Sequence, residues 1–513
     1  MTFFESLLLL LAIAIGLLQI SRRLAIPYPT MLAAAGVLLA LVPGAPTITL
    51  DPATALALLI APALCDAAYE FPARAVWRLW RPLLAFAVFA VVLSAAAVAF
   101  VGVQVVGLPL FAAIALGAIV APPDAAAATA ILGSVRMPRR SVAILKGESL
   151  LNDATALLLF TAAVSFHGRG NMDAGLAIQL GLAAPGGVLL GIALAWLLRF
   201  LLPFFNRTLS AYLLEYLFSF GAWIVAEHLH LSAVLCVVAF AMTFARLESQ
   251  VTPPLMRLHN VAISHTTVFL FNVLAFLLMG FQARSIVEAM APDRLREAAW
   301  FATLVIVVLI VVRMAWVVTF NRLAHRFKFV RGDFTPSSLR HAVLVGWCGM
   351  RGLVTLATAI ALPADFPQRD LIVLTAFAVV LATLVVQGLT LAPLVRWLGL
   401  DAEDGLAAEL AETRADLVAT ALASLENDKG PVADHWRFAF NTVRLSVVPG
   451  GDPSRLQDRR RLGQKAMHRQ RERLEHLHHE QRIGPDAFAI LQEELDIAEV
   501  ALTTECERQI AES

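Results

Sequence analysis

The chain has 513 residues, 59% of them hydrophobic and 15% charged. Because a soluble domain carries about 25% charged residues, this composition excludes an ordinary soluble protein and indicates a polytopic membrane protein. The net charge of +1 argues against nucleic acid as a partner. The four cysteines are scattered and lack the spacing of a metal cluster or a disulfide framework. No basic residue precedes the first apolar run, so we expect no cleaved secretory signal.

Thirteen apolar stretches, long enough or nearly long enough to span a bilayer, follow one another up to residue 400. They predict an all-α polytopic membrane domain over residues 1–400, with one transmembrane helix for each stretch. The stretches lie at 3–20, 30–43, 52–72, 82–102, 108–134, 141–166, 174–199, 210–229, 231–247, 263–283, 297–321, 340–362 and 370–398.

The basic residues of the connecting loops are unevenly divided between the two sides of the membrane. Alternate loops hold seventeen on one side and five on the other. Since the richer side is cytoplasmic, we expect the N-terminus outside and the C-terminus in the cytoplasm, which requires an odd number of spans. The richer set contains Arg22, Arg23, Arg74, Arg78, Arg81, Arg136, Arg139, Arg140, Arg199, Arg207, Arg246, Arg257, Arg322, Arg326, Lys328, Arg331 and Arg340, and the poorer set contains Arg169, Arg284, Arg294, Arg296 and Arg369.

The composition changes after Leu400, where glutamate, arginine, glutamine and histidine become frequent. Residues 401–513 contain no stretch long enough to span, so we expect a soluble cytoplasmic tail. Amphipathic helices are predicted at Glu403–Leu425, at Arg455–Arg482 and, after a Gly-Pro break, at Asp486–Ile510. A histidine cluster with arginine and glutamate at every turn is typical of a solvated helical face more than of a metal site; it comprises His468, His476, His478 and His479.

The fifth apolar stretch contains Ala121-Pro122-Pro123-Asp124. Two consecutive prolines remove two amide donors and disfavour helical geometry before them, so the helix should break near the middle of the bilayer. Broken backbone at that depth is tolerated only inside protein or beside a water-filled cavity. Asp124 is expected at the N-terminus of a second half-helix, where the dipole favours a carboxylate. The alternative is a proline kink with a capping aspartate and no transport role.

The twelfth stretch contains a corresponding interruption, Gly346-Trp347-Cys348-Gly349-Met350-Arg351-Gly352. Glycines at three-residue spacing weaken the helix and allow a close approach of backbones. The fifth and twelfth stretches are seven apart, which fits two inverted repeats, spans 1–6 and 8–13, with span 7 as a connector. Discontinuous helices at corresponding positions of two repeats indicate the binding site of a transporter. We therefore predict a crossover formed by Pro122, Pro123, Gly349 and Gly352.

The sixth stretch carries Glu148, Ser149, Asn152 and Asp153. Ionisable residues at membrane depth are costly and therefore indicate function. Glu148 and Asn152 share one helix face, and Ser149 and Asp153 share the neighbouring one. We expect Glu148 to pair with Arg351, because each buried charge needs compensation. Asp153 then remains without a fixed cation and can hold either a proton or a small cation. Such competition at one site is enough to couple two opposite fluxes.

Further charged residues lie in other stretches. Asp66, on a predicted helix with its own Pro62, is another acid at membrane depth; it either contacts the ligand or lines a water-filled vestibule. Glu215 and Glu227, near the ends of the eighth stretch, are expected to be structural. The sequence assigns no partner to Arg313 in the eleventh stretch.

Three motifs in the fifth, sixth and twelfth stretches resemble the sodium/proton exchanger branch of the monovalent cation–proton antiporters, and its bacterial members most closely. They read GAIVAPPDAAAATAI, GESLLNDATALLLF and GMRGLVTLA. The GESLLND string is highly specific. Pro62–Tyr69 and Ala226–Val238 also resemble the family, so the resemblance covers essentially the whole membrane region, and the tail shows a weaker similarity.

The resemblance implies a role for each matching residue. Asp153 corresponds to the aspartate that binds both the cation and the proton, and Asn152 is its neighbour in the Asn-Asp pair. Ser149 corresponds to a hydroxyl that coordinates the cation. Glu148 and Arg351 correspond to a buried structural ion pair. Members with asparagine at this place are typically electroneutral and exchange one Na⁺ for one H⁺.

The resemblance also implies roles for two further acidic residues. Asp124 corresponds to the acid of a Thr-Asp-Pro motif at the helix crossover, and Asp66 to an acid that reaches the site from the third span. This chain departs from the motif, because it reads Pro123-Asp124-Ala125. The threonine hydroxyl that often ligates the cation is therefore absent, which bears on the preference among Na⁺, Li⁺ and K⁺.

The resemblance also implies a homodimer that works by elevator-like alternating access. In such an assembly a core, residues 82–166 and 297–398, moves against a dimerisation part, residues 1–72 and 174–283. Membrane lipid and the transported Na⁺ and H⁺ complete the expected partners.

The sequence thus predicts an antiporter of the bacterial inner membrane that exchanges Na⁺ or Li⁺ for H⁺. We expect neither ATP nor another cofactor, since the sequence contains no phosphate-binding loop or nucleophile elbow. We expect no enzyme, since no nucleophile–base or metal-ligand arrangement appears. One alternative is a K⁺/H⁺ antiporter of the same fold. Another, from a different class, is a cation channel or an ion-sensing receptor that signals through the tail.

Overall fold

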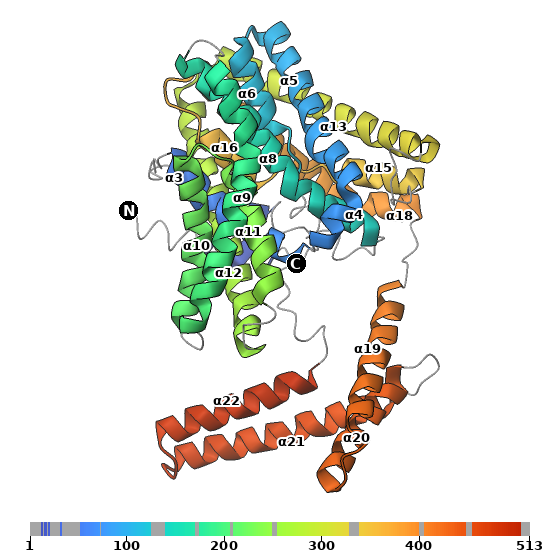
Figure 1. Ribbon diagram of the computed structural model, residues 1–513. Helices are drawn as coiled ribbons and strands as arrows, with labels where there is room; N and C mark the ends of the chain where they lie inside the picture. The colour runs from blue at the N-terminus through green and yellow to red at the C-terminus, as the bar shows by residue number, and fades with distance from the viewer. Residues whose placement is uncertain are drawn as a thin grey trace. The chain divides into compact units, whose positions relative to one another are not determined.

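A computed structural model describes residues 52–71, 73–124, 139–169, 174–205, 209–248, 254–327, 338–399, 405–447 and 454–503, with a few residues between 12 and 32. Within these ranges all regular elements are helices (Figure 1). The chain divides into two compact units, one containing Met1–Asp401 and the other Ala402–Glu512. The first unit holds the apolar stretches and the second holds the charged tail.

The helices of the first unit follow the apolar stretches of the sequence. Each expected stretch from residue 52 onward lies at least in part on one or more of them, whereas 3–20, 30–43 and the end of the fifth stretch, 125–134, lie largely outside the described residues. The elements are α3 (Pro52–Glu70), α4 (Ala73–Leu84), η1 (Ala85–Ala90), α5 (Val91–Val106), α6 (Leu110–Val120), α8 (Arg139–Arg169), α9 (Ala174–Phe205), α10 (Leu209–His228), α11 (Ala233–Glu248), α12 (Pro254–Ala289), α13 (Pro292–Arg326), α15 (Leu339–Trp347), α16 (Leu353–Ile360), α17 (Arg369–Ala382), η2 (Thr383–Gln387) and α18 (Gly388–Leu398).

Five helices among the described residues are long and apolar enough to cross a bilayer by their length and composition. They are Val76–Val106, Ala143–Gly168, Ile178–Phe205, Pro292–Arg326 and Arg369–Leu398. Shorter apolar helices lie at Leu56–Tyr69, Leu110–Val120, Ala233–Leu247 and Ala262–Phe276. These lengths fit the bilayer dimension on which the sequence prediction depended.

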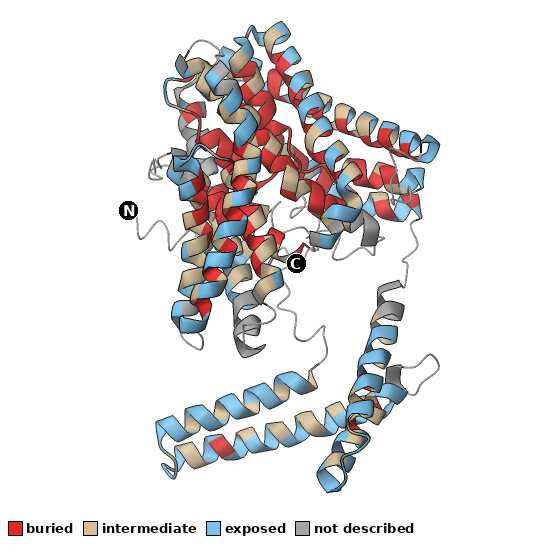
Figure 2. Ribbon diagram, in the orientation of Figure 1, coloured by how far each residue is buried: buried red, intermediate tan, exposed pale blue. Residues whose placement is uncertain are grey.

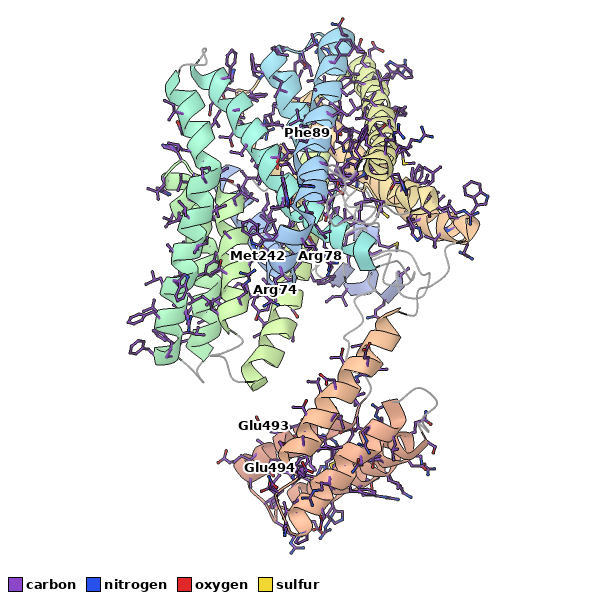
Figure 3. The ribbon with its side chains drawn as sticks, turned by 45° about the vertical axis from the view of Figure 1, so that its right-hand side comes forward. Arg74, Arg78, Phe89, Met242, Glu493 and Glu494 are labelled. Atoms are coloured by element: carbon purple, nitrogen blue, oxygen red, sulfur yellow. The ribbon has the colours of Figure 1, made fainter. Side chains whose placement is uncertain are left out.

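Two of the long helices contain a π-helical stretch. The first runs through α4, η1 and α5 without a break, and Pro82, which has no N–H to donate, lies just before η1. Arg74 and Arg78 lie on α4, and Phe89 lies farther along in η1 (Figure 3). The second runs through α17, η2 and α18. Prolines and π-helical turns are both known sources of helix bending.

The apolar core of the first unit consists of two main clusters. One joins buried residues of α5, α6, α13 and α15–α18, and the other joins buried residues of α3 and α9–α11. Helix α8 contributes to both clusters, and Figure 2 shows buried residues where the helices of this unit meet. Small residues permit the closest contacts: a β-carbon on Gly191 of α9 would meet the backbone of Cys236 in α11. Helices α12 and α16 also contribute to both clusters, so α8, α12 and α16 join the two parts of the core.

The tail unit consists of four described helices, α19 (Gly405–Ser424), α20 (Pro431–Val447), α21 (Ser454–His479) and α22 (Pro485–Leu502). Three of them coincide with the predicted helices, whereas α20 was not predicted. Arg471 of α21 donates to Asp496 of α22 at 2.6 Å and to Glu499 at 2.7 Å, which joins these two helices.

The histidine cluster lies on α21. His468 and His476 each lie within 3.3 Å of the glutamate one turn later, and both imidazoles are largely exposed. The ring of His478 stacks on Phe488 at 4.3 Å. Within the described residues no group of three or more potential ligands could hold a metal ion.

Candidate functional site

Two breaks in the helical structure, in the fifth and twelfth apolar stretches, meet in the first unit. Helix α6 ends at Val120, and Ala121–Asp124 are not helical; α15 ends at Trp347, and α16 begins at Leu353. The N–H of Asp124 donates to the carbonyl of Met350 at 2.7 Å, which joins the two interruptions. Both breaks fall where the double proline and the glycines predicted them. The half-helix expected after Asp124 lies outside the described residues.

The interruption leaves backbone carbonyls that a continuous helix would have satisfied. In such a helix the Val120 carbonyl would accept from the N–H of Asp124, but that N–H goes to Met350. The Arg351 Nε takes its place and donates to Val120 at 3.1 Å, while Nη1 donates to the carbonyl of Gly349. Arg351 is fully buried, and its own N–H donates to Thr383 Oγ1 at 3.1 Å. The Arg351 side chain therefore links the end of α6 to the break between α15 and α16 by hydrogen bonds.

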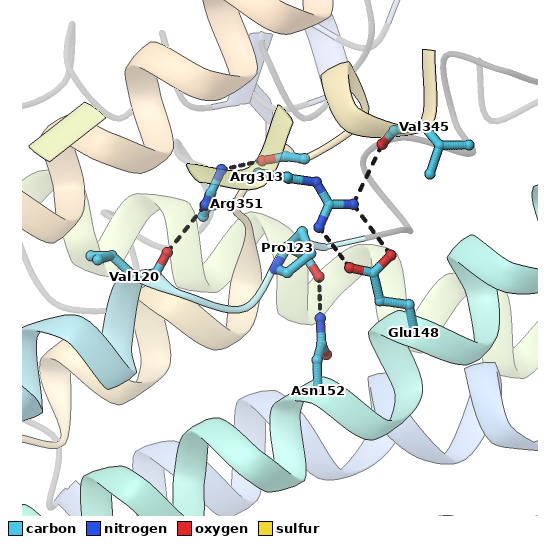
Figure 4. A network of polar contacts seen from close by, with 8 residues as sticks. Val120, Pro123, Glu148, Asn152, Arg313, Val345 and Arg351 are labelled. Carbon is cyan, nitrogen blue, oxygen red and sulfur yellow. Dashed lines mark hydrogen bonds and ion pairs between the residues drawn. The ribbon is translucent and has the colours of Figure 1, made fainter. Parts of the chain in front are cut away.

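The buried ion pair is formed by Glu148 and Arg313 (Figure 4). Arg313 donates to both carboxylate oxygens of Glu148, at 2.6 and 3.2 Å, and to the carbonyl of Val345 at 3.5 Å. The two side chains are 1% and 4% exposed. The expected pair of Glu148 with Arg351 is therefore wrong. Arg313 comes from α13, and a bidentate guanidinium–carboxylate contact leaves no need for a second arginine.

Two glycines of the twelfth stretch make this arrangement possible. A β-carbon on Gly349 would meet the Arg313 side chain, and one on Gly352 would meet the Asp124 carboxylate. At both positions the close neighbour is a side chain, whereas the glycine spacing predicted a close approach of backbones. What the sequence did not reveal is that one of the neighbours is Arg313.

Gly352→Ala is expected to lower the unfolding temperature of the full chain in detergent. The added β-carbon meets the Asp124 carboxylate, and overpacking costs about 1–3 kcal/mol. Gly221→Ala in α10 is the control, because a β-carbon there meets no atom within 4 Å. Equal unfolding temperatures for the two variants would contradict the close approach at Gly352.

The predicted binding residues lie on α8 beside the interruption. Asn152 Nδ2 donates to the carbonyl of Pro123 at 2.8 Å, so the proline segment rests on α8. Asn152 Oδ1 is buried and has no hydrogen-bond partner among the described residues. Asp153 is buried, and the charge of Asp124 acts on it. Ser149 is partly buried on the same helix. The structure thus gathers carboxylate and amide oxygens, the ligands that hard cations prefer.

Asp66 of α3 has polar contacts with α10 and α12. It accepts a hydrogen bond from Ser264 Oγ of α12, and its charge acts on Tyr216 of α10. Tyr216 in turn donates to Thr267 of α12 at 3.1 Å. These contacts place Asp66 among α3, α10 and α12, whereas the contacts of Asp124 tie it to the interruption.

An apolar helical bundle in which buried acids adjoin two interrupted helices defines a multi-pass membrane transporter of small cations. The transmembrane family model described as sodium/hydrogen exchanger matches residues 8–397. The chain belongs to this family, and the resemblance seen in its motifs is confirmed at that level.

Known relatives extend the comparison. An uncharacterised Na⁺/H⁺ exchanger of Mycobacterium tuberculosis is 29% identical over 521 residues, which cover 96% of this chain and 95% of the relative. A sodium, potassium, lithium and rubidium/H⁺ antiporter of Bacillus pumilus is 30% identical over 416 residues, 76% of this chain and 61% of the relative. The sodium proton antiporter MjNhaP1 of Methanocaldococcus jannaschii is 17% identical, has a TM-score of 0.59 and is covered completely by 76% of this chain. That last similarity concerns the fold alone.

Proposed function

We propose that the protein exchanges Na⁺ or Li⁺ for H⁺ across the membrane, with the cation and the proton competing for Asp153. The observation that carries the proposal is that two buried oxygen-bearing side chains are adjacent on α8. Asp153 supplies a carboxylate, and Asn152, the residue before it, supplies an amide oxygen that lacks a partner among the described residues. Membership of the sodium/hydrogen exchanger family supports the same reaction. Asp124 and Ser149 are proposed as further oxygen ligands.

Competition follows from the chemistry of one carboxylate. A protonated Asp153 no longer carries the negative charge that attracts a cation, and a bound cation favours the ionised form. The site therefore carries either ion but not both. If only the occupied site crosses the membrane, every cation moved in one direction is balanced by a proton moved in the other.

The charges around the interruption favour electroneutral exchange of one Na⁺ for one H⁺. Of the described residues that contact the interruption or bind there in this proposal, Arg313 and Arg351 contribute two positive charges, and Glu148, Asp124 and Asp153 contribute three negative charges when ionised. One Na⁺ or one proton neutralises the excess negative charge. The site with bound Na⁺ and the site with a bound proton then both have a net charge of zero. The empty site has one net negative charge and is costly to move through a bilayer.

We further propose how the parts of the membrane unit divide the work. The core, residues 82–166 and 297–398, moves against the remaining helices of a homodimer in the bacterial inner membrane, with the tail in the cytoplasm. The ion pair between α8 and α13 supports joint movement of these two helices. Asp66, outside the interruption, is proposed to attract cations toward the site from the dimerisation part.

Exchange by the purified full chain in liposomes tests the proposal. An inward Na⁺ gradient is expected to make the lumen alkaline, as reported by an enclosed pH dye, and the rate should stay the same when the membrane potential is clamped at different values. A lumen pH that does not respond to any alkali cation would contradict antiport. Na⁺ entry without a pH change would instead indicate a channel.

K⁺/H⁺ exchange is a second candidate, favoured by one feature of the site. Pro123 stands where a threonine hydroxyl often ligates the cation, so this site has one ligand fewer to define a small ion. The Bacillus pumilus relative is named for sodium, potassium, lithium and rubidium. Replacing the Na⁺ gradient by Li⁺ or K⁺ in the same liposomes separates the candidates.

A further inference from the structure

Helix α4 carries three distinct rows of side chains along its length. Val76, Leu79 and Leu83 are buried or partly buried and face the protein. Residues spaced three and four apart share a helix face, so the remaining positions form two outer rows. One row consists of Arg74, Arg78 and Arg81, and the other consists of Trp77, Trp80 and Leu84.

Most side chains of the two outer rows are exposed. Trp77 is 79% and Trp80 50% exposed. Arg74 and Arg78 are exposed and form no ion pair or hydrogen bond with the described residues (Figure 3). The Arg81 guanidinium lies over the Trp80 ring at 5.3 Å. The surface thus presents two arginines, Arg74 and Arg78, that no described residue pairs, directly beside large aromatic side chains.

The position of α4 in a long helix places this surface at the edge of the bilayer. The continuous helix Val76–Val106 has 31 residues, which corresponds to about 46 Å at 1.5 Å per residue. The hydrocarbon core takes only about 30 Å, or roughly 20 residues. Since residues 87–106 are apolar or uncharged and their outer face exposes Phe89, Val92 and Phe100, the surplus falls on the segment that carries the arginines.

We propose that α4 binds the headgroup of an anionic phospholipid at this membrane boundary. Arg74 and Arg78 supply the charge and the planar donors that phosphate prefers, and Arg81 extends their row. Trp77 and Trp80 lie where tryptophans are enriched, at the level between headgroups and acyl chains. A soluble phosphate compound would use the arginines and leave the tryptophan row uncovered, so the complementary partner is a lipid.

The proposed lipid would act next to the candidate site through direct packing. Leu83 of α4 and Phe71 both lie so close to Gly147 of α8 that a β-carbon there would meet them. Glu148 follows Gly147 in the chain. A headgroup bound to α4 therefore holds the helix against the segment of α8 that begins the buried polar network.

Thermal unfolding of the full chain in neutral detergent tests the inference without relying on ion exchange. Phosphatidylglycerol is expected to raise the unfolding temperature, whereas phosphatidylcholine and glycerol 3-phosphate are not. In Arg74→Gln/Arg78→Gln, half of the rise should need a roughly thirtyfold higher phosphatidylglycerol concentration, and in each single variant a roughly fivefold higher one, given the usual contribution of one arginine at an anionic surface.

Arg322→Gln/Arg326→Gln is the matched control. It removes two exposed arginines from the end of α13 and is expected to leave the phosphatidylglycerol titration unchanged. An unchanged titration for the α4 variants, or an equal change in the control, would contradict the α4 site. A response to glycerol 3-phosphate equal to that of the lipid would show an anion site and overturn the lipid assignment.

Discussion

Glu148→Gln is expected to destabilise the folded protein more than any other single change proposed here. The substitution leaves the Arg313 guanidinium buried without its counter-charge, and breaking one partner of a buried pair costs about 3–5 kcal/mol. The unfolding temperature of the full chain in detergent should fall accordingly. Glu297→Gln on the exposed surface of α13 makes the same chemical change and should leave the unfolding temperature unaltered.

Double variants test whether Arg313 or Arg351 is the partner of Glu148. Arg313→Gln added to Glu148→Gln removes the orphaned charge and is expected to recover part of the lost stability. Arg351→Gln added to Glu148→Gln should recover nothing, because Arg351 donates to the carbonyls of Val120 and Gly349, which the change would leave unsatisfied. Recovery by Arg351→Gln instead of Arg313→Gln would contradict the pair described here.

Asp153→Asn is expected to abolish Na⁺-driven proton movement in liposomes while the protein stays folded. The amide keeps the shape of the carboxyl group but can neither release a proton nor attract a cation by charge. The measurement is the initial rate of the enclosed pH dye after a Na⁺ gradient is applied, compared with protein-free liposomes.

The interpretation of Asp153→Asn needs a control for the loss of a carboxylate as such. Asp370→Asn changes an exposed acid in the first turn of α17 and should transport at the rate of the unaltered protein. Equal unfolding temperatures for the two variants would exclude a folding defect. Transport at the unaltered rate by Asp153→Asn would remove Asp153 from the proposed mechanism.

Much of the fold could be predicted because bilayer thickness fixes the length of an apolar helix. The breaks at Pro122-Pro123 and around Gly349 were equally accessible, since proline removes a backbone donor and glycine weakens a helix. Helix α20 was not predicted, because the tail helices were inferred from amphipathic runs rich in charged residues. Trp436 and Phe438 place exposed apolar side chains in α20 and interrupt such a pattern.

The partner of Glu148 could not be deduced from residue types. Arg313 and Arg351 both lie inside apolar stretches, and residue type alone does not distinguish them as partners of a buried carboxylate. The Arg351 guanidinium donates instead to the backbone carbonyls of Val120 and Gly349. Those carbonyls face it only because of the path of the backbone, which the sequence does not reveal. The sequence feature that indicated a further buried ion pair was Arg313 itself, because a charge inside an apolar stretch requires a partner.

The π-helical stretch η2 is the place in this long helix where the chain length can change by one residue without turning α18. Thr383, its first residue, receives the N–H of Arg351. Because a π-helical turn holds an extra residue, deleting one residue from 383–387 would convert the segment to regular α-helix and keep the buried side of α18, including Leu391 and Val395, facing inward. The same deletion inside the regular helix α17 would rotate α18 by about 100°. In an alignment, a single-residue gap at 383–387 would therefore be compatible with an unchanged packing register.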